Sequence, residues 1–493
     1  MNSFLQFPFH YPFPSDFAAS IMNSSSLSKF EADEPLTPAG RLFLRPEINQ
    51  IIHCVVGLQN SIDIDSVKSQ IADSVMIQHP RFSSLLVRDR NGVEYWRRTS
   101  IEIDRHVIVV AERVSDEGVD DEKAVNQYLA DLAISPSMDA DKPLWEIHLL
   151  LAHNCAVFRI HHALGDGISL MSMFLTCCRR ADDPNALPTI VSNSKAVRRN
   201  MRQRSWADEI PKMLLEFLFA VWFSFWFVAE FILRALWVSD RKTPISGGDG
   251  VELWPRKVAT AKFAVEDMKA VKKAVPNATI NDILFSVIGA GLSRYLEHRQ
   301  PKGLKEGLQL TGVAMVNLRE QPGLQDLTNM MKGNRGSRWG NKLGVLLLPV
   351  NCHKKMLDPL QYVKKTKKLL DRKKRTLEAH FSYGIGKLVM SCLGPKVACI
   401  LNYRIVCNTS FTISNVIGPR EEITIGGNPV TYIRATSTSL SHALTMHMMS
   451  YAGRAEMQIL VAKDIIPDPE FLAECFENAL LEMKTSAEVF NTK

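Results

Sequence analysis

A short stretch at residues 161–167, His-His-Ala-Leu-Gly-Asp-Gly, carries residue types that suit proton transfer. His161 and His162 are imidazoles with a free pKa near neutral pH, so either could act as a general base. Asp166 could orient an imidazole or pair with a buried arginine, and Gly167 would allow close approach of the backbone. These residues predict a catalytic base with its support, although the same residues could simply end a strand.

The elements around this stretch predict a strand-to-helix junction. Residues 142–162 read as two strands, and the run ISLMSMFLTCC after Gly167 carries apolar residues at helical spacing. Side chains alternate between the two faces of a strand, so only one of His161 and His162 can face a given cavity. Loops held by rigid elements often carry catalytic groups.

Several familiar chemistries lack their motifs in this chain. The sequence contains no Gly-x-Ser-x-Gly elbow, no P-loop and no His-Glu-x-x-His helix, and its nine cysteines form no Cys-x-x-Cys pair. We therefore expect no metal site and no serine nucleophile. The remaining chemistry is direct transfer, in which an external nucleophile activated by histidine attacks an activated carbonyl.

The composition is that of a globular protein with ample core. Of the 493 residues, 46% are apolar and 23% are charged, which suits two or three domains or one large two-lobed unit. The net charge of +7 mildly favours anionic partners such as a membrane surface or a nucleotide-bearing cofactor. The odd number of cysteines favours a reducing compartment.

Residues 213–238 form the most unusual segment. Nine of these 26 residues are Phe or Trp, a content typical of membrane interfaces. The 13 uncharged residues between Glu216 and Glu230 would cover roughly 20 Å as a helix, less than the ~30 Å hydrocarbon core. A membrane span, an in-plane or re-entrant helix and a buried core helix are the three alternatives. Residues 353–375 carry ten Lys or Arg against two Asp and predict a solvated helix face, a lipid-head-group patch or a phosphate-binding surface.

The motif HHALGDG resembles the HHxxxDG signature of the CoA-dependent acyltransferase superfamily. More narrowly, the chain resembles the plant wax ester synthase/diacylglycerol acyltransferase family over roughly residues 30–485. One departure is the VNLR block, where the family pattern has a valine before the arginine. The blocks that carry the resemblance, in order, are EPLTP, DKPLWEIHLL, HHALGDGISL, NATINDILFSVIGAGLSRYL, VNLR, GNKLGVLLLPV, SNVIGP and ALTMHMMSYAG.

The resemblance implies a mixed α/β fold of two chloramphenicol-acetyltransferase-like lobes with an active-site tunnel between them. It implies that His162 is the general base, with His161 in support, and that Asp166 is turned away from the substrate to hold the loop. Asn281 and Asp282 match the family's Asn-Asp pair, which would support the site. From the residues alone, Asn281 could equally be a helix N-cap, and Asp282 suits the first turn of a helix.

Other candidates are weaker. Trp145 is expected to form a site wall or core, and Arg319 is expected to end a strand or to hold a carboxylate. The remaining candidates are three possible oxyanion donors, Ser437, Ser439 and Ser441, and two histidines expected to pack or face solvent, His442 and His447.

The expected organisation has four parts. A flexible arm covers residues 1–30, and an N-terminal acyltransferase lobe covers 31–180. A linker with the membrane-associating helix covers 181–250, and a C-terminal acyltransferase lobe covers 251–485. If both lobes build one site, they lie on the same side of a membrane. This argument favours a monotopic or re-entrant segment over a single span.

We therefore predict a membrane-associated O-acyltransferase. It would move a fatty acyl group from acyl-CoA, used as co-substrate, to a long-chain fatty alcohol, to diacylglycerol or to both. No bound cofactor and no nucleic-acid partner are expected. The expected site of action is the endoplasmic reticulum membrane, with the plasma membrane as a second location and the lobes in the cytosol.

The alternatives are a soluble acyltransferase of specialised metabolism and a lipid-binding homologue that has lost activity. The soluble group usually has a DFGWG block, which this chain lacks. An aromatic apolar segment such as 213–238 is also not expected in a soluble enzyme. A peptide-synthetase condensation domain would need carrier neighbours, for which the chain has no room. Only an assay separates an active enzyme from a binding protein.

Overall fold

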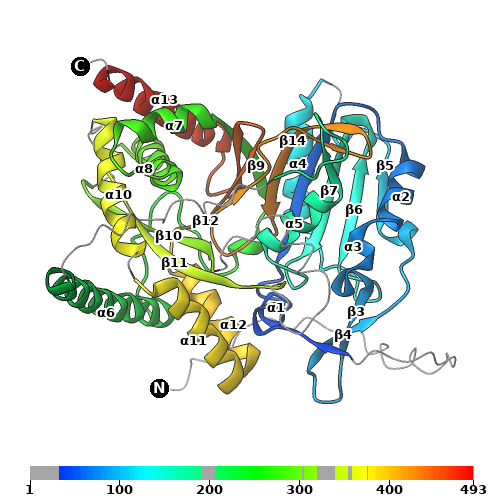
Figure 1. Ribbon diagram of the computed structural model, residues 1–493, viewed down its shortest axis with the longest axis horizontal. Helices are drawn as coiled ribbons and strands as arrows, with labels where there is room; N and C mark the ends of the chain where they lie inside the picture. The colour runs from blue at the N-terminus through cyan, green and yellow to red at the C-terminus, as the bar shows by residue number, and fades with distance from the viewer. Residues whose placement is uncertain are drawn as a thin grey trace.

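The computed structural model describes residues 33–116, 118–189, 206–301, 305–318, 339–353, 358–374 and 376–491. Two lobes, each built on a mixed sheet, lie side by side (Figure 1). This arrangement confirms the predicted two-lobed α/β fold. The predicted arm at 1–30 lies outside the described residues.

The first lobe contains a sheet of seven strands with helices on both faces. The strand order across the sheet is β5 (Val107–Val110), β6 (Trp145–Leu150), β7 (Cys155–His161), β2 (Ile51–Leu58), β14 (Asn428–Ser437), β13 (Ile423–Ile425) and β8 (Cys178–Arg180). The helices of this lobe are α1 (Pro38–Phe43), α2 (Ile64–Ala72), α3 (Val75–Gln78), α4 (Asp121–Ala133) and α5 (Gly167–Thr176). A small sheet beside them joins β1 (Glu34–Pro35), β4 (Glu94–Arg98) and β3 (Ser84–Arg88).

The alternation of side chains along β2 decides which helices cover each face of this sheet. Val55 packs with Leu129 of α4, whereas Val56 packs with Met171 of α5. Both valines are fully buried. A strand with apolar residues at consecutive positions is typical of a sheet covered on both faces.

The boundary predicted between the lobes is wrong for one hairpin. β13 and β14 come from the predicted C-terminal lobe, 251–485, but complete the sheet of the first lobe (Figure 1). β14 pairs with β2 from Val430 opposite Leu58 to Ser437 opposite Ile52. Such pairing joins strands hundreds of residues apart, so no local pattern in the sequence reports it.

The second lobe contains a six-stranded sheet. Its order is β11 (Leu343–Cys352), β10 (Leu308–Asn317), β12 (Phe411–Ile417), β15 (Leu444–Tyr451), β16 (Arg454–Ala462) and β9 (Arg256–Ala264). One face carries α7 (Val265–Ala274), α8 (Ile280–Arg299), α10 (Pro359–Lys374) and α13 (Pro469–Asn491).

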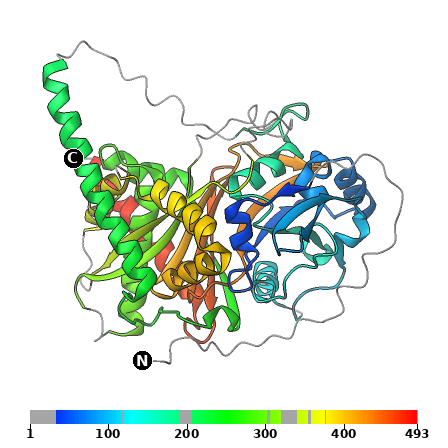
Figure 2. The ribbon, with the colours of Figure 1, turned by 90° about the horizontal axis from the view of Figure 1, so that it is seen from below.

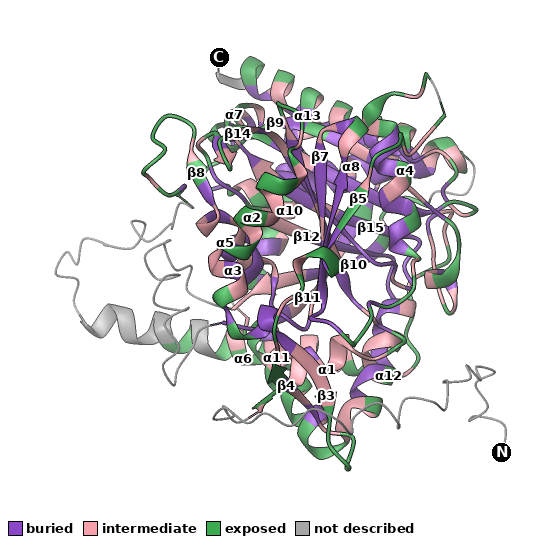
Figure 3. Ribbon diagram, turned by 90° about the vertical axis from the view of Figure 1, so that its right-hand side faces the viewer, coloured by how far each residue is buried: buried purple, intermediate pink, exposed green. Residues whose placement is uncertain are grey.

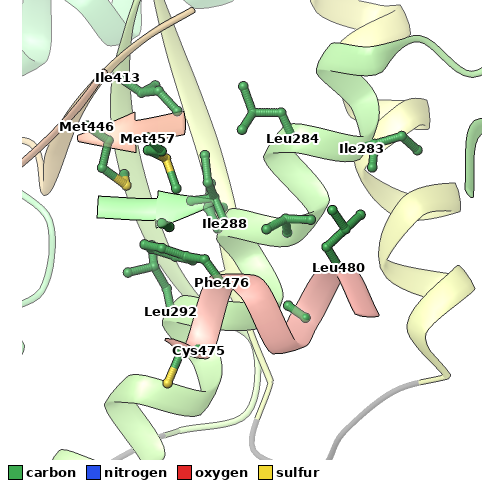
Figure 4. Close-up of a cluster of buried hydrophobic side chains, with 14 of the residues drawn as sticks. Ile283, Leu284, Ile288, Leu292, Ile413, Met446, Met457, Cys475, Phe476 and Leu480 are labelled. Atoms are coloured by element: carbon green, nitrogen blue, oxygen red, sulfur yellow. The ribbon is translucent and has the colours of Figure 1, made fainter. Parts of the chain in front are cut away.

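The core of this lobe forms where α8 and α13 meet the sheet (Figure 4). Ile288 of α8 and Phe476 of α13 both have no exposed surface. A Cβ added at Gly291 would lie 2.3 Å from the Phe476 ring, so only glycine allows the two helices to approach this closely. Figure 3 shows buried strands through the centre of the molecule, with exposed residues on the outer helices and loops.

The apolar segment predicted at 213–238 lies in α6 (Trp206–Leu236). Its C-terminal part packs on the second lobe beside α11 (Glu378–Cys392) and α12 (Gly394–Cys407), and its other end projects from the body (Figure 2). Arg234 is buried and donates to Thr311 at 2.7 Å and to Asp240 at 2.9 Å. The predicted linker, 181–250, thus contains a helix whose C-terminal part packs on the second lobe.

Candidate active site

The stretch HHALGDG forms the predicted junction between β7 and α5. β7 ends at His161, and Asp166 is the N-cap of α5 because its Oδ1 accepts a hydrogen bond from the backbone N–H of Ser169 at 3.0 Å. Gly167 is the first residue of the helix and lines a large cavity. The loop is therefore held by a strand on one side and a capped helix on the other.

The two histidines point in different directions, as alternation along a strand predicts. His162 lines the cavity, whereas His161 is buried in the first lobe and is not part of the cavity wall. His161 Nδ1 accepts a hydrogen bond from the N–H of Ala163 at 3.1 Å. Burial lowers the pKa of His161 to about 3, so it stays neutral and supports the loop.

Asn341 holds His162 from the other lobe. Its side-chain amide donates to the His162 carbonyl at 2.9 Å, and its Oδ1 lies 3.1 Å from His162 Nδ1. Since Oδ1 can only accept, Nδ1 carries the proton and the lone pair is left on Nε2. Phe43 also contacts the imidazole, with ring centroids 4.2 Å apart. This arrangement fixes both the ring and its tautomer.

The environment of His162 keeps the imidazole neutral. Burial lowers the pKa of His162, and the negative charge of Asp166 opposes this shift in part. A histidine that is neutral at pH 7 has a lone pair available to accept a proton. The site therefore contains an imidazole whose lone pair could accept a proton without prior deprotonation.

Asp166 joins the loop of the first lobe to the segment that carries Asn341. The carboxylate is fully buried, and its Oδ2 accepts a hydrogen bond from the Lys342 backbone N–H at 3.0 Å. Nearby, the Trp339 indole donates to the Leu164 carbonyl at 2.8 Å. The Asp166 carboxylate thus connects the two segments through backbone hydrogen bonds from Ser169 and Lys342.

The cavity beside His162 has a volume of about 790 Å³ and is mainly apolar. Some of its polar residues come from elements of both lobes. They include Gln50 of the first lobe and Asn317, Thr412, Ser414, Asn415 and His447 of the second. A large apolar cavity with a few convergent polar groups is the usual form of a small-molecule site.

Neither Asn281 nor Asp282 lines the cavity. Asn281 does not cap the helix, one of the two roles that the sequence allows for it, because Thr279 caps α8 and Asp282 completes the capping box. Asp282 is fully buried and accepts from the Thr279 N–H at 2.7 Å. Asn281 Oδ1 accepts from the side chain of Asn415, a lining residue, at 2.8 Å. Asn281 therefore contacts one lining residue, whereas Asp282 stabilises the start of α8.

Trp145 lies in the core of the first lobe rather than in the cavity wall. Its indole donates to the Phe82 carbonyl at 2.8 Å and its ring stacks on His106. Trp145 is the first residue of β6, a strand buried on both faces, so the indole ring fills space behind the site. Arg319 lies outside the described residues.

The serine and histidine candidates separate in the structure. Ser437 lines the cavity, whereas the hydroxyl of Ser441 donates to Glu252 at 2.9 Å and Ser439 does not line the cavity. His442 is buried as expected, but His447 lines the cavity. Within the described ranges, no group of three or more His, Cys, Asp or Glu could hold a metal ion.

The sequence interpretation missed Asn341, Phe43, Gln50 and His447 as site residues. Asn341 stands in the block GNKLGVLLLPV, but nothing local distinguishes it from a turn asparagine. Its role depends on contact with a residue 179 positions away. Only the docking of the two lobes brings these residues together.

Comparison with known proteins gives consistent matches over most of the chain. Residues 61–284 match the wax ester synthase/diacylglycerol acyltransferase catalytic domain, and residues 339–484 match the WS/DGAT C-terminal domain. Wax ester synthase/diacylglycerol acyltransferase 5 of Arabidopsis thaliana is 35% identical, covering 92% of this chain and 94% of its own. The corresponding protein 2 of the same plant is 36% identical, covering 93% and 96%.

Two solved structures share the fold at low sequence identity. The wax ester synthase/diacylglycerol acyltransferase from Marinobacter aquaeolei VT8 has a TM-score of 0.57 at 19% identity, covering 92% of this chain and 100% of its own. A trichothecene 15-O-acetyltransferase from Fusarium sporotrichioides has a TM-score of 0.56 at 12% identity, covering 92% and 95%.

Proposed function

Since this chain belongs to the wax ester synthase/diacylglycerol acyltransferase family and is therefore an acyltransferase, we propose that it transfers a fatty acyl group from acyl-CoA to a lipid hydroxyl. The acceptor is a long-chain fatty alcohol, a diacylglycerol or both. The observation that carries the proposal is the neutral His162, held by Asn341 of the other lobe, in the wall of a large apolar cavity. Apolar walls suit the hydrocarbon chains of these substrates.

In the proposed reaction, His162 Nε2 removes the proton from the acceptor hydroxyl as its oxygen attacks the thioester carbonyl carbon. The carbonyl oxygen gains the negative charge in a tetrahedral intermediate. The intermediate collapses, the carbon–sulfur bond breaks, and the departing thiolate takes the proton from the imidazolium. The products are an ester and CoA, and the histidine is regenerated. A positioned base of this kind contributes about 10² to 10⁴ to the rate.

Purified protein in lipid vesicles with labelled palmitoyl-CoA tests this proposal. Hexadecanol and a diacylglycerol are offered together, and the labelled products are separated. His162→Ala should lower ester formation by about 10²-fold or more, while His298→Ala, at an exposed position on α8, should not. An excess of wax ester would identify the alcohol as the preferred acceptor, and an excess of triacylglycerol would identify the diacylglycerol. Equal background from the wild type and His162→Ala would favour the binding-protein alternative.

We further propose that α6 holds the enzyme on the cytosolic face of the endoplasmic reticulum membrane, with its axis in the plane of the bilayer. Along α6, large apolar side chains at three- and four-residue spacing are exposed on one face. They include Leu214, Leu218, Trp222, Phe225 and Trp226.

The opposite face of α6 is committed to the protein. Ser224 Oγ accepts a hydrogen bond from the Leu377 N–H at 3.3 Å, and Arg234 is buried against the second lobe. The Lys373 ammonium, from the basic helix α10, lies 3.4 Å from the centre of the Phe227 ring. A helix with one free apolar face and one face packed on the protein suits attachment to a membrane surface.

The stretch Leu218–Leu236 is long and apolar enough to cross a membrane, but length and composition alone support this reading. A span would have to release the packed face of α6 from the second lobe. It would also separate His162, before α6, from Asn341, after it. These two residues form one site, so the in-plane arrangement is the one we propose.

A further inference from the structure

We propose that the part of the cavity inside the first lobe binds one unbranched aliphatic chain of a substrate and limits its length to about 16 carbons. This inference rests on the proposed function, because the chain must be joined to the group that reacts at His162. It adds to the proposed function that the residues of β2 limit the length of the bound chain.

The part of the cavity inside the first lobe, called the channel below, has a wall that follows one strand. Ile52, Cys54, Val56 and Leu58 are alternate residues of β2, and all four line the cavity. Alternate residues point to the same face of a strand. Ile52 lies near the catalytic end, because the His162 N–H donates to the carbonyl of Gln50 at 2.8 Å.

The length of this wall matches a fatty chain. Six residue steps from Ile52 to Leu58 cover roughly 20 Å at about 3.3 Å per residue. A fully extended hydrocarbon advances about 1.25 Å per carbon, as C–C bonds of about 1.5 Å at near-tetrahedral angles require. About 16 carbons therefore reach from the catalytic end to Leu58.

The far end of the channel changes from apolar to polar. Ser66 and Gln70 of α2 and Arg179 of β8 line the cavity there, and all three residues are exposed. Leu58 and Ile425, on the hairpin that completes the first-lobe sheet, both line the cavity and pack against the same apolar cluster. Carbons beyond this point meet polar groups and water, so they add no burial.

The proposal predicts how the specificity constant kcat/KM depends on chain length. Each methylene buried along β2 should raise kcat/KM by up to about fourfold, and the increase should stop near 16 carbons. Acyl-CoA thioesters of 8 to 20 carbons are tested with one alcohol, and alcohols of the same lengths are tested with one acyl-CoA. The substrate whose chain length changes kcat/KM, either the acyl-CoA or the alcohol, is the one whose chain occupies the channel.

Val56→Phe should shorten the channel. Four residue steps from Ile52 leave roughly 13 Å, enough for about 10 carbons. We expect rates with the 10-carbon substrate to stay within about twofold, while those with the 16-carbon substrate fall at least tenfold. Val55→Phe is the matched control, since Val55 is equally buried on the same strand but packs against α4 on the other face. It should lower all rates alike.

Binding of decanoyl-CoA and palmitoyl-CoA is measured by calorimetry in parallel. Loss of preference for the longer chain in Val56→Phe, in either measurement, supports the channel. An unchanged preference, an equal shift for both substrates, or the same shift in Val55→Phe would overturn it. If the wild type is inactive but Val56→Phe still removes the binding preference for palmitoyl-CoA, the proposed function is refuted and the channel is not. If Val56→Phe does not fold, Leu58→Trp at the half-buried end should disfavour 18 carbons relative to 14.

Discussion

Asn341 of the second lobe and His162 of the first are joined by two contacts, 3.1 Å between Asn341 Oδ1 and His162 Nδ1 and 2.9 Å from the Asn341 amide to the His162 carbonyl. The candidate base is therefore complete only when the lobes are docked. The same interface carries the hydrogen bond from the Lys342 N–H to Asp166. The orientation of the base and the packing of the lobes are thus one structural property.

Asn341 should control the tautomer of the base. Asn341→Ala removes the acceptor for Nδ1–H, and we expect kcat to fall by about 10- to 100-fold, part of the 10² to 10⁴ that a general base contributes. Asn341→Asp keeps an acceptor and adds a negative charge, so it should retain more activity and raise the pKa of His162. Steady-state kinetics against pH would measure both effects. Equal losses in the two variants, with no shift in the pH profile, would contradict the tautomer role.

The pH profile of the wild type should report a lowered pKa of His162. Burial favours the neutral imidazole, so protonation, which removes the base, requires a pH below the ordinary value of about 6.5. We expect the acid limb of kcat/KM to have its midpoint below pH 6.5. A midpoint above 7 would indicate that the charge of Asp166 outweighs burial.

Asp166→Asn tests the bracing role. An amide nitrogen in place of Oδ2 cannot accept the Lys342 N–H, which leaves a buried donor unsatisfied at a cost of about 1 to 3 kcal/mol. The free energy of unfolding, measured with denaturant, should fall by this amount. Since the neutral amide no longer raises the pKa of His162, the acid limb should also move to lower pH. Unchanged stability together with an unchanged profile would rule out this role.

Four histidines with strongly lowered pKa values should make the fold sensitive to acid. Burial lowers the pKa to about 3 for His79, His161 and His442, and to about 4 for His447. The unfolded chain binds a proton at each of them below about pH 6.5, while the folded protein does not. Each therefore lowers the free energy of unfolding by up to about 1.4 kcal/mol per pH unit as the pH falls from 6.5 toward its folded pKa. The free energy of unfolding should therefore depend steeply on pH below 6.5. His79→Gln should reduce this slope by the contribution of one proton, up to about 1.4 kcal/mol per pH unit.

The exposed face of α6 should govern membrane binding. Trp222→Asp with Trp226→Asp places two charges on this face and removes two aromatic anchors, each worth roughly 1.5 to 3 kcal/mol when buried. Vesicle flotation should show binding reduced by at least tenfold. Leu481→Asp, at an exposed apolar position on α13, is the control. In sealed vesicles, trypsin should reach both lobes from outside, and protection of one lobe only would require a span.

Local sequence patterns determined the elements around the base. HHALGDG follows an apolar strand and precedes residues at helical spacing, and this order of elements is what the structure contains. The apolar character of α6 was equally visible, because aromatic content and spacing are properties of adjacent residues. The resemblance, rather than the spacing, indicated which histidine faces the cavity.

The tertiary structure alone decided which distant residues complete the site. It placed β14 beside β2, brought Asn341 to His162, and buried Trp145 behind the cavity. It also made Thr279 rather than Asn281 the cap of α8. Periodicity and turn chemistry act between neighbours in the chain, whereas strand pairing and lobe docking depend on the complementarity of surfaces hundreds of residues apart. The base can therefore be read from seven adjacent residues, but the contacts that orient it exist only in the folded protein.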